Sequence, residues 1–352
     1  MLTRTVRLTL PLVAVALCLL TGCSRTGADA NPPYTTDLGT ATELRLGYSA
    51  GVDQAPVLAG LTKSVFSNKL GSTKLTPVAS GNGPEAVTAL LGGSLDAAFV
   101  DVGAAIDAYA KSPDKVRLIS GVTSNGVELV VRPTVTKPAD LAGKTVATLR
   151  AGSAPDVALR KWLAANELTS KVKVATMDDS LIVSAFQKGL VDAAWVSEPT
   201  ASTLAITARA NVLIDEAALW PRHVFPTVVL VARSQYVSEH PATVTGLLEG
   251  LIASIELVDP VSPDARQAVQ ATVNDKLGKK LSPPVLHRAI QYLRFDVDPY
   301  PPLILQLAQD RVAAGTQPQA PALAGFADFQ PLDKALAGSH RSTVAPAGLG
   351  PK

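Results

Sequence analysis

One phrase occurs twice in this chain, once in each half, and it constrains the fold more than any other feature. Residues 93–100 read Gly-Ser-Leu-Asp-Ala-Ala-Phe-Val, and residues 189–196 read Gly-Leu-Val-Asp-Ala-Ala-Trp-Val. In each copy an amphipathic, helix-like stretch ends at a Gly that can adopt a left-handed cap, and an Asp and a short apolar strand follow. The two copies lie too far apart for a solenoid repeat, so they predict two similar lobes.

Short apolar runs alternate with helix-like stretches through both halves, which is typical of βαβ units. We expect strands over 43–48, 73–79, 95–101, 116–122 and 127–132, and then over 144–149, 171–177, 191–197 and 211–214. A β-branched run over 224–232 returns to the first sheet. Helices that begin at or near Pro follow over 241–258, 263–276, 283–294 and 301–314. The fold class is therefore α/β, with two lobes that each hold a mostly parallel sheet flanked by helices.

The order of these elements predicts where the chain changes lobes. Residues 43–125 and 224–336 form lobe I, residues 126–223 form lobe II, and the crossings lie near Gly126 and Trp220. Residues 337–352 are small and polar, and we expect them to form a disordered tail. Two lobes that each present the C-terminal ends of their strands suggest a ligand held between them.

The N-terminus has the features of a processing signal. Arg4 and Arg7 precede an apolar stretch over 8–20, and Leu-Thr-Gly-Cys then ends at Cys23, which resembles the bacterial lipobox. We expect residues 1–22 to be removed, Cys23 to carry the lipid, and residues 23–42 to form a tether. The protein would then be extracytoplasmic and lipid-anchored to the bacterial cell membrane. An ordinary secretory signal followed by an accidental Cys is the alternative.

Charge and cysteine content exclude several classes of protein. The chain has 32 basic and 30 acidic residues, and loss of the two Arg of the signal leaves a neutral mature protein. Neutrality does not suggest nucleic acid or a polybasic membrane contact. Loss of Cys18 and lipidation of Cys23 would leave no thiol for a disulfide or a zinc–thiolate site. We expect a monomer without a metal or cofactor.

Two short motifs suggest enzymes. Gly-Tyr-Ser-Ala-Gly over 47–51 fits the nucleophile elbow of a hydrolase, with Ser49 as nucleophile, although no helix starts directly after it. A secreted serine hydrolase is therefore the alternative class. Gly-Asn-Gly-Pro-Glu-Ala over 81–86 fits a permissive dinucleotide fingerprint, but Pro84 lacks a backbone N–H where pyrophosphate would bind. A helix N-terminus that binds one small anion or polar group is the better interpretation.

Acidic residues divide into two kinds at the repeated strands. Asp96 and Asp192, between the Gly and the strand, are expected to bond the backbone of their own turns. Asp101 and Glu198, just past the strands, are better candidates for ligand contact, although each could instead cap the following helix. Trp195, the counterpart of Phe99, is expected to line the cleft.

Several motifs occur in an order that is similar to one known family. They are Leu46-Gly-Tyr-Ser49, Ser80-Gly81 before a helix, Asp140-Leu-Ala-Gly-Lys-Thr-Val146 before Ala151-Gly-Ser-Ala154, Asp192-Ala-Ala-Trp-Val-Ser-Glu-Pro199 and Ser238-Glu-His-Pro241. Over residues 44–258 the chain resembles the solute-binding lipoproteins of ABC importers. The branch that it resembles takes up aliphatic sulfonates, taurine, nitrate and thiamine precursors.

The resemblance implies a two-lobed, periplasmic-binding-protein-like fold of type II that closes by a hinge motion around a small solute and delivers it to an ABC permease with its ATPase. Carried over by position, the ligand contacts would be Ser49, Asp53, Gln54, Ser80, Gly81, Asn82, Asp101, Val102, Ser153, Ala154, Trp195, Glu198 and Pro199.

The charges of these loops limit which class of solute can bind. Asp53, Asp101 and Glu198 are acidic, and Arg150 is the one nearby base. A ligand that carried only negative charge would be repelled in a desolvated cleft. We therefore expect a taurine-like aminosulfonate, with its acid group on helix N-termini and its amine on Glu198 or Asp101. Nitrate or bicarbonate, or an amine such as a thiamine precursor, is the alternative.

Overall fold

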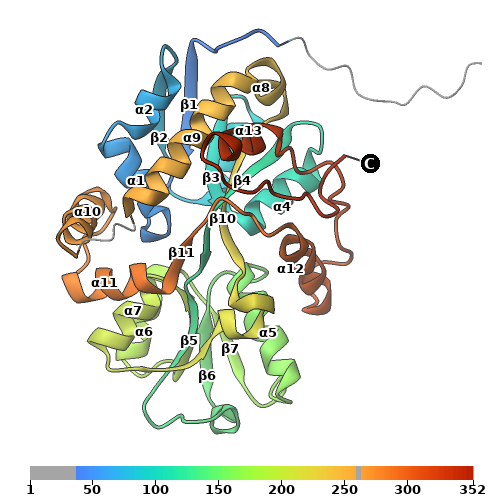
Figure 1. The fold of residues 1–352 in the computed structure, drawn as a ribbon. Helices are drawn as coiled ribbons and strands as arrows, with labels where there is room; N and C mark the ends of the chain where they lie inside the picture. Colours follow the sequence, from blue (N-terminus) through green and yellow to red (C-terminus); the bar gives the residue numbers. More distant parts are fainter. Residues whose placement is uncertain (1–36, 259–262, 352) are drawn as a thin grey trace, which may run out of the picture. The chain divides into compact units, whose positions relative to one another are not determined.

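The structure is a computed structural model that describes residues 37–258 and 263–351. The predicted signal peptide, the lipid on Cys23 and most of the predicted tether lie outside the described residues. The described chain forms two β-sheets, A and B, with helices packed on them (Figure 1). The predicted α/β fold with two sheets is therefore confirmed.

Sheet A, the sheet of lobe I, has the strand order β11-β4-β10-β3-β1-β2. Its strands are β1 (Glu43–Tyr48), β2 (Lys74–Ala79), β3 (Ala97–Asp101), β4 (Val116–Asn125), β10 (Pro226–Arg233) and β11 (Leu293–Phe295). Strand β1 is parallel to β2 and β3, whereas β10 is antiparallel to both β3 and β4, and β11 is antiparallel to β4.

Sheet B, the sheet of lobe II, has the order β7-β6-β8-β5-β9. Its strands are β5 (Val127–Val131), β6 (Thr145–Thr148), β7 (Lys173–Thr176), β8 (Ala193–Ser197) and β9 (Asn211–Asp215). Strand β6 is parallel to β7 and β8, and β5 is antiparallel to β8 and β9.

Both sheets are mixed: most strands of each sheet run in one direction, and the crossings explain two strands that run against them. Strand β4 ends at Asn125 and β5 begins at Val127, so only Gly126 separates the two sheets there. A strand that enters a sheet from the other lobe starts at the edge where the βαβ strands end. Both β5 and β10 therefore run against their neighbours.

Helices cover both sheets. In lobe I they are η1 (Val52–Gln54), α1 (Ala55–Thr62), α2 (Val65–Leu70), α3 (Gly83–Leu91) and α4 (Val102–Lys111). In lobe II they are η2 (Pro138–Leu141), α5 (Ala154–Ala165), α6 (Asp179–Gln187) and α7 (Thr200–Thr207), and the return crossing holds η3 (Glu216–Leu219) and η4 (Pro221–His223). The C-terminal part holds α8 (Ser234–Glu239), α9 (Pro241–Val258), α10 (Pro263–Lys276), α11 (Pro283–Tyr292), α12 (Pro301–Ala313) and α13 (Gln330–Gly338).

Helix α9 is the longest apolar helix of the described chain. By length and composition alone it could cross a membrane, but half of it is buried. It packs on α1, α2 and α13, and its Leu247, Leu248 and Leu251 belong to the core of lobe I.

The two copies of the repeated phrase form equivalent joints. Gly93 and Gly189 have φ values of 79° and 77°, as the predicted left-handed caps require. The following acids bond across to a neighbouring strand instead of their own turns. Asp96 accepts from the backbone N–H of Arg45, and Asp192 accepts from that of Thr145, both at 2.9 Å. The prediction of a local turn bond is therefore wrong, because the start of β1 or β6 lies beside each turn.

The C-terminal tail is ordered, contrary to the prediction. The backbone N–H groups of Ala327 and Gly325 donate to the carbonyls of Leu349 and Gly350 at 2.8 and 2.7 Å. The Leu349 side chain is fully buried in the core of lobe I. Low hydrophobicity predicted disorder, but the segment is held on the lobe by Leu349, by these backbone bonds and by an ion pair between Arg341 and Glu256.

We expect Leu349→Ala to lower the free energy of unfolding by about 2–4 kcal/mol, because it leaves a cavity in a packed core. Urea unfolding would measure the change. The control is Leu181→Ala, since the Leu181 side chain is 55% exposed and its removal should change stability by less than about 0.5 kcal/mol. Equal effects of the two substitutions would contradict a packed tail.

Candidate ligand-binding cleft

A cavity of about 590 Å³ lies between the ends of the strands of the two sheets. Lobe I contributes Asp53 beside α1, the start of α3 and the start of α4. Lobe II contributes the segment before α5, the start of α6 and the end of β8. Both crossings, at Gly126 and around Phe225, also line the cavity, so a solute here would contact both lobes and both hinges.

Most of the predicted contacts lie in or beside this cavity. Those that line it are Asp53, Gly81, Asn82, Asp101, Val102, Ser153, Ala154 and Glu198. Ser49, Gln54 and Ser80 line an adjoining pocket of about 150 Å³, which shares Asp53, Gly81, Asn82 and Asp101 with the main cavity. Trp195 and Pro199 are absent from the described lining of both.

Two helix N-termini of lobe I face the cavity. Asn82 caps α3 by accepting from the N–H of Glu85 at 2.9 Å, and the Glu85 carboxylate in turn accepts from the N–H of Gly81 at 2.8 Å. Asp101 caps α4 by accepting from the N–H of Ala104 at 2.8 Å. Asp101 therefore does have the capping role that was the alternative, and it lines the cavity as well.

The position of Asp101 depends on a glycine in the neighbouring helix. A Cβ atom at Gly83 would lie 2.2 Å from Asp101 Oδ2, so a larger residue would displace this carboxylate from its place beside the start of α3. The second Gly of the dinucleotide-like motif is thus explained by packing.

Glu198 is not free to bind a ligand amine. Its side chain is fully buried and accepts from the N–H and the hydroxyl of Ser202, at 3.0 and 2.8 Å. Arg288 of α11 donates to the same carboxylate at 3.1 Å. The expectation that the amine binds Glu198 is therefore corrected. The pairing with Arg288 was missed because no motif surrounds that residue and 90 residues separate the partners.

Trp195 is a core residue, so the prediction that it lines the cleft is wrong. The side chain is fully buried, and its ring lies 5.9 Å from that of Trp162. Its Nε1 donates to Glu216 Oε2 at 2.7 Å, and Trp220 Nε1 donates to Glu216 Oε1 at 3.3 Å. Sequence alternation could not reveal a buried acid as the partner of the indole.

The cavity is strongly acidic. Its described lining includes the acidic residues Asp53, Asp101, Asp178, Asp179, Glu198 and Glu216 and one basic residue, Arg150. The carboxylates of Glu198 and Glu216 are held by Arg288 and by two indole N–H groups, so the four Asp residues give the cavity its negative charge. Burial raises the pKa of Asp53 to about 6, and the negative charges of Asp101 and Asp179 add to this effect. Burial also raises the pKa of Glu216 to about 7, although the two indole N–H groups oppose the shift.

Burial also raises the pKa values of two other acids that line the cavity, Asp101 and Asp179. The pKa of Asp101 is raised because surrounding protein displaces water, although the bond from Ala104 and the charge of Arg150 oppose it. The pKa of Asp179 is raised by burial against its hydrogen bond from Thr200. A positively charged group in the cavity would relieve the unfavourable crowding of these carboxylates.

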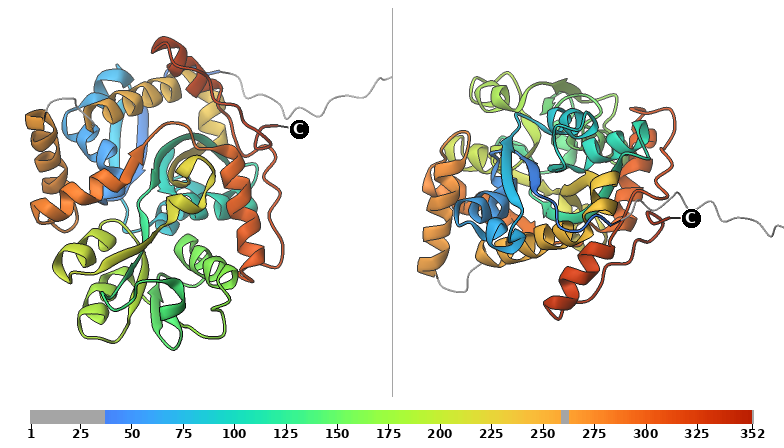
Figure 2. Two further views of the ribbon diagram at one scale, coloured as in Figure 1. Left: turned by 60° about the horizontal axis from the view of Figure 1, so that its bottom comes forward. Right: turned by 90° about the horizontal axis from the view of Figure 1, so that it is seen from above.

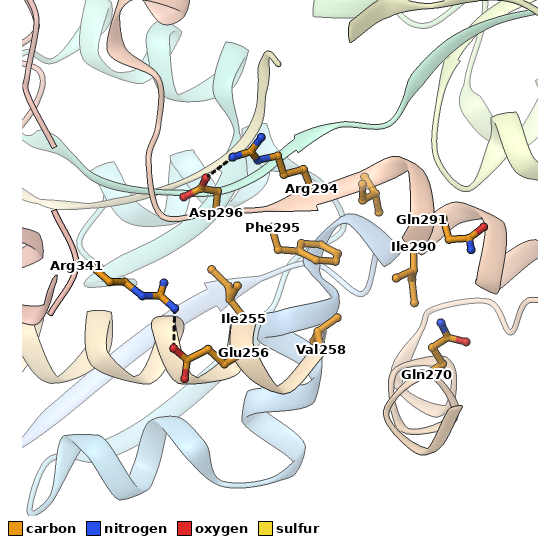
Figure 3. Close-up of a pocket in the computed structure, with 11 residues that line it drawn as sticks. Ile255, Glu256, Val258, Gln270, Ile290, Gln291, Arg294, Phe295, Asp296 and Arg341 are labelled. Carbon is orange, nitrogen blue, oxygen red and sulfur yellow. Dashed lines mark hydrogen bonds and ion pairs between the residues drawn. The ribbon is translucent and has the colours of Figure 1, made fainter. Parts of the chain in front are cut away.

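A second cavity, of about 610 Å³, lies in lobe I among α9, α10, α11 and β11. Each of its two Arg side chains forms an ion pair with a carboxylate: Arg294 with Asp296 at 3.2 Å, and Arg341 with Glu256 at 2.6 Å (Figure 3). The remaining lining is largely apolar, and Val258 borders residues outside the described range. None of the predicted contacts lies in this cavity.

Ser49 lacks the surroundings of a nucleophile. Its backbone N–H donates to Gln54 Oε1 at 2.9 Å, which ties it to the turn before α1. Within the described chain, no His side chain lines the small pocket that holds Ser49. A general base of the usual kind is therefore missing from the described surroundings of Ser49.

The sequence of this chain is similar to those of known proteins. The model of the NMT1-like family matches residues 39–274. A Brucella abortus protein named as a binding protein is 29% identical over 209 residues, 58% of this chain and 63% of the relative, so the chain spans less than two thirds of that protein. The taurine-binding periplasmic protein of Escherichia coli is 26% identical over 152 residues, 42% of this chain and 46% of the relative.

A solved structure of a binding protein has a similar fold. The alkanesulfonate-binding protein SsuA from Xanthomonas axonopodis, bound to MOPS, has a TM-score of 0.65 at 20% identity, over 80% of this chain and 97% of its own. The fold that the sequence motifs implied is therefore confirmed. The family match runs from before β1 into α10, and it includes every lining residue of the cleft except Leu293 and Leu307. Because the match covers more than half of the chain, the chain belongs to the NMT1-like family.

Proposed function

We propose that this protein is the extracytoplasmic solute-binding component of an ABC importer and that its solute is a small aminosulfonate of the taurine type. The lobes would close around the solute, and the closed form would present it to a permease driven by an ATPase. Lipid on Cys23 would anchor the protein, as a monomer, to the bacterial cell membrane.

The charge of the cleft carries the choice of solute. Asp53, Asp101 and Asp179 line the cavity with no described cation at hydrogen-bond distance, and Arg150 is the one basic residue in the described lining, so an anion without a compensating amine would be repelled. An amine placed beside Asp53, Asp101 and Asp179 would offset the negative charge of these three carboxylates. The names of the relatives agree with this charge pattern: one binds taurine, and one structure holds MOPS, which carries both an amine and a sulfonate.

The sulfonate has a separate place to bind. The N-termini of α3 and α5 lie at the cavity, with Asn82 and Ser153 in their capping positions. Ser153 Oγ has no hydrogen-bond partner in the described chain, and Arg150 lies three residues before it. Backbone N–H groups, a hydroxyl and one guanidinium are suitable donors for a sulfonate.

Three solutes that differ by one charged group test the proposal. We expect taurine to raise the melting temperature by roughly 5 °C at a hundredfold excess over its Kd, because it binds only the folded state. Ethanesulfonate lacks the amine and ethylamine lacks the sulfonate, so each should give a much smaller shift. Equal shifts with ethanesulfonate and taurine would contradict the amine site. If ethylamine alone equalled taurine, the solute would be an amine, and if none had an effect, the aminosulfonate proposal would fail.

A further inference from the structure

Two C-terminal helices contact both lobes. Helix α11 continues into β11, which is paired with β4 of lobe I, yet α11 also packs on α7 of lobe II. Helix α12 packs on α4 of lobe I and on α5 of lobe II. Figures 1 and 2 show α11 and α12 on opposite sides of the strands that cross between the lobes.

Arg288 is the contact that α11 makes with lobe II. Its Nη2 donates to both carboxylate oxygens of Glu128, at 3.0 and 2.9 Å, and its Nη1 donates to Glu198 and to the hydroxyl of Ser202. The side chains of Glu128 and Glu198 have no exposed surface, and that of Arg288 is 16% exposed. The guanidinium face also lies over the ring of Tyr292, 4.1 Å from its centre.

This ion cluster lies beside a crossing. Glu128 is the second residue of β5, and the N–H of Glu198 donates to the carbonyl of Gly126 at 2.8 Å. A Cβ atom at Gly126 would lie 2.4 Å from Leu293 Cδ2, so the first residue of β11, which directly follows α11, packs on the crossing. Lobes that rotate about a hinge move least relative to each other near the hinge, so these ion pairs can persist during closure.

Helix α12 makes the corresponding contact on the other side. Asp310 accepts from Lys161 of α5 at 2.7 Å, and the next residue, Arg311, donates to Asp107 of α4 at 2.6 Å. Asp310 and Arg311 are both buried. Two consecutive side chains of one helix therefore bind the two lobes.

We propose that α11 and α12 form an interlobe clasp that sets the angle through which the lobes can move. Arg288 is its central positioning residue: it fixes Glu198, which lines the ligand cavity, and it neutralises that carboxylate so that it does not bind solute. The clasp goes beyond the proposed transport function, because it does not depend on which solute binds.

The test needs a variant that removes the ion pairs without leaving an unpaired buried charge. Arg288→Met alone would leave two buried carboxylates and could prevent folding. The triple variant Arg288→Met, Glu128→Gln, Glu198→Gln keeps the shapes of the two acidic side chains, shortens the Arg side chain to an apolar stem and removes all three charges. Arg294→Met is the matched control, because Arg294 lies six residues further along, its described ion pair is with Asp296 of its own lobe, and its side chain is 56% exposed.

Hydrogen–deuterium exchange of the full chain without ligand is the measurement. We expect the triple variant to exchange about tenfold faster in peptides covering 120–130 and 196–202, with little change in the centres of the sheets. Small-angle scattering should show a larger radius of gyration, and Arg288→Lys should be intermediate because one ammonium cannot replace a forked guanidinium. The Arg294→Met control should match wild type.

Two results would overturn the clasp. One is unchanged exchange at the crossing and an unchanged radius of gyration in the triple variant. The other is faster exchange spread evenly over both sheets, which would make Arg288 a general stabilising residue. Neither result depends on taurine, so failure of the clasp and failure of the proposed transport function are distinguishable.

Discussion

Asp96→Asn is expected to lower the free energy of unfolding by about 3 kcal/mol, whereas the same change in its twin, Asp192, should cost about 1 kcal/mol or less. Asp96 is 3% exposed. It accepts from the backbone and guanidinium of Arg45, at 2.9 and 2.6 Å, and from Arg233 at 3.0 Å. An amide cannot accept all these bonds, and two guanidinium groups would lose their counter-charge.

The twin residue is the control because the repeated phrase gives it the same backbone setting. The Asp192 side chain is 29% exposed, and its one described ion pair, with Lys144, is long at 3.9 Å. Solvent screens such a pair, so little is lost with the charge. Urea unfolding of both variants at neutral pH would measure the difference. If both cost the same, the arginine contacts of Asp96 would contribute nothing beyond the shared backbone bond.

The acid dependence of stability gives a second measurement on Asp96. Burial alone would raise its pKa, but the hydrogen bonds from Arg45 and Arg233 outweigh burial and lower it. A lowered folded-state pKa means that the stabilisation is complete above the ordinary value of 3.8 and is lost as pH falls below it. The stability difference between wild type and Asp96→Asn should therefore shrink below pH 3.8.

Local patterns predicted the elements of this fold well. Alternating and continuous apolar runs located the strands, and the Pro residues at helix starts gave α9 and α10 at the observed bounds, because these signals lie within a few residues of the element. The crossing was predicted near Gly126, between expected strands over 116–122 and 127–132, and the structure extends the first strand to Asn125. Asp101 and Glu198, which follow the repeated strands, line the cavity, and contact with a ligand stays a prediction for Asp101.

Long-range pairing was the part that the sequence did not reveal. The directions of β5 and β10 follow from how the chain changes sheets, and no local residue encodes that. Arg288 and Glu198 are 90 residues apart, and the Trp195–Glu216 bond depends on a 3₁₀ turn placed beside the core. The two side-chain misses each concern a charged or polar group whose partner lies on another element.

Asp101→Asn is expected to weaken taurine binding by roughly 10- to 100-fold, because it removes a desolvated carboxylate from the proposed amine site. Asn is also a good helix N-cap, so the bond to the N–H of Ala104 and the stability of the fold should be kept. Binding of ethanesulfonate should stay equal or improve. Isothermal titration calorimetry would measure both affinities, with Asp114→Asn, on an exposed turn, as the control.

The same variant should change how binding depends on pH. In wild type, Asp53 titrates at a pKa of about 6, so taurine affinity should fall as pH drops from 7 to 5 and this carboxylate gains a proton. The negative charge of Asp101 contributes to that raised pKa, and its removal should lower it. The midpoint of the affinity loss should therefore move to lower pH in Asp101→Asn, although burial keeps it above the ordinary value for Asp. An unchanged midpoint would show that the two carboxylates do not share the amine site.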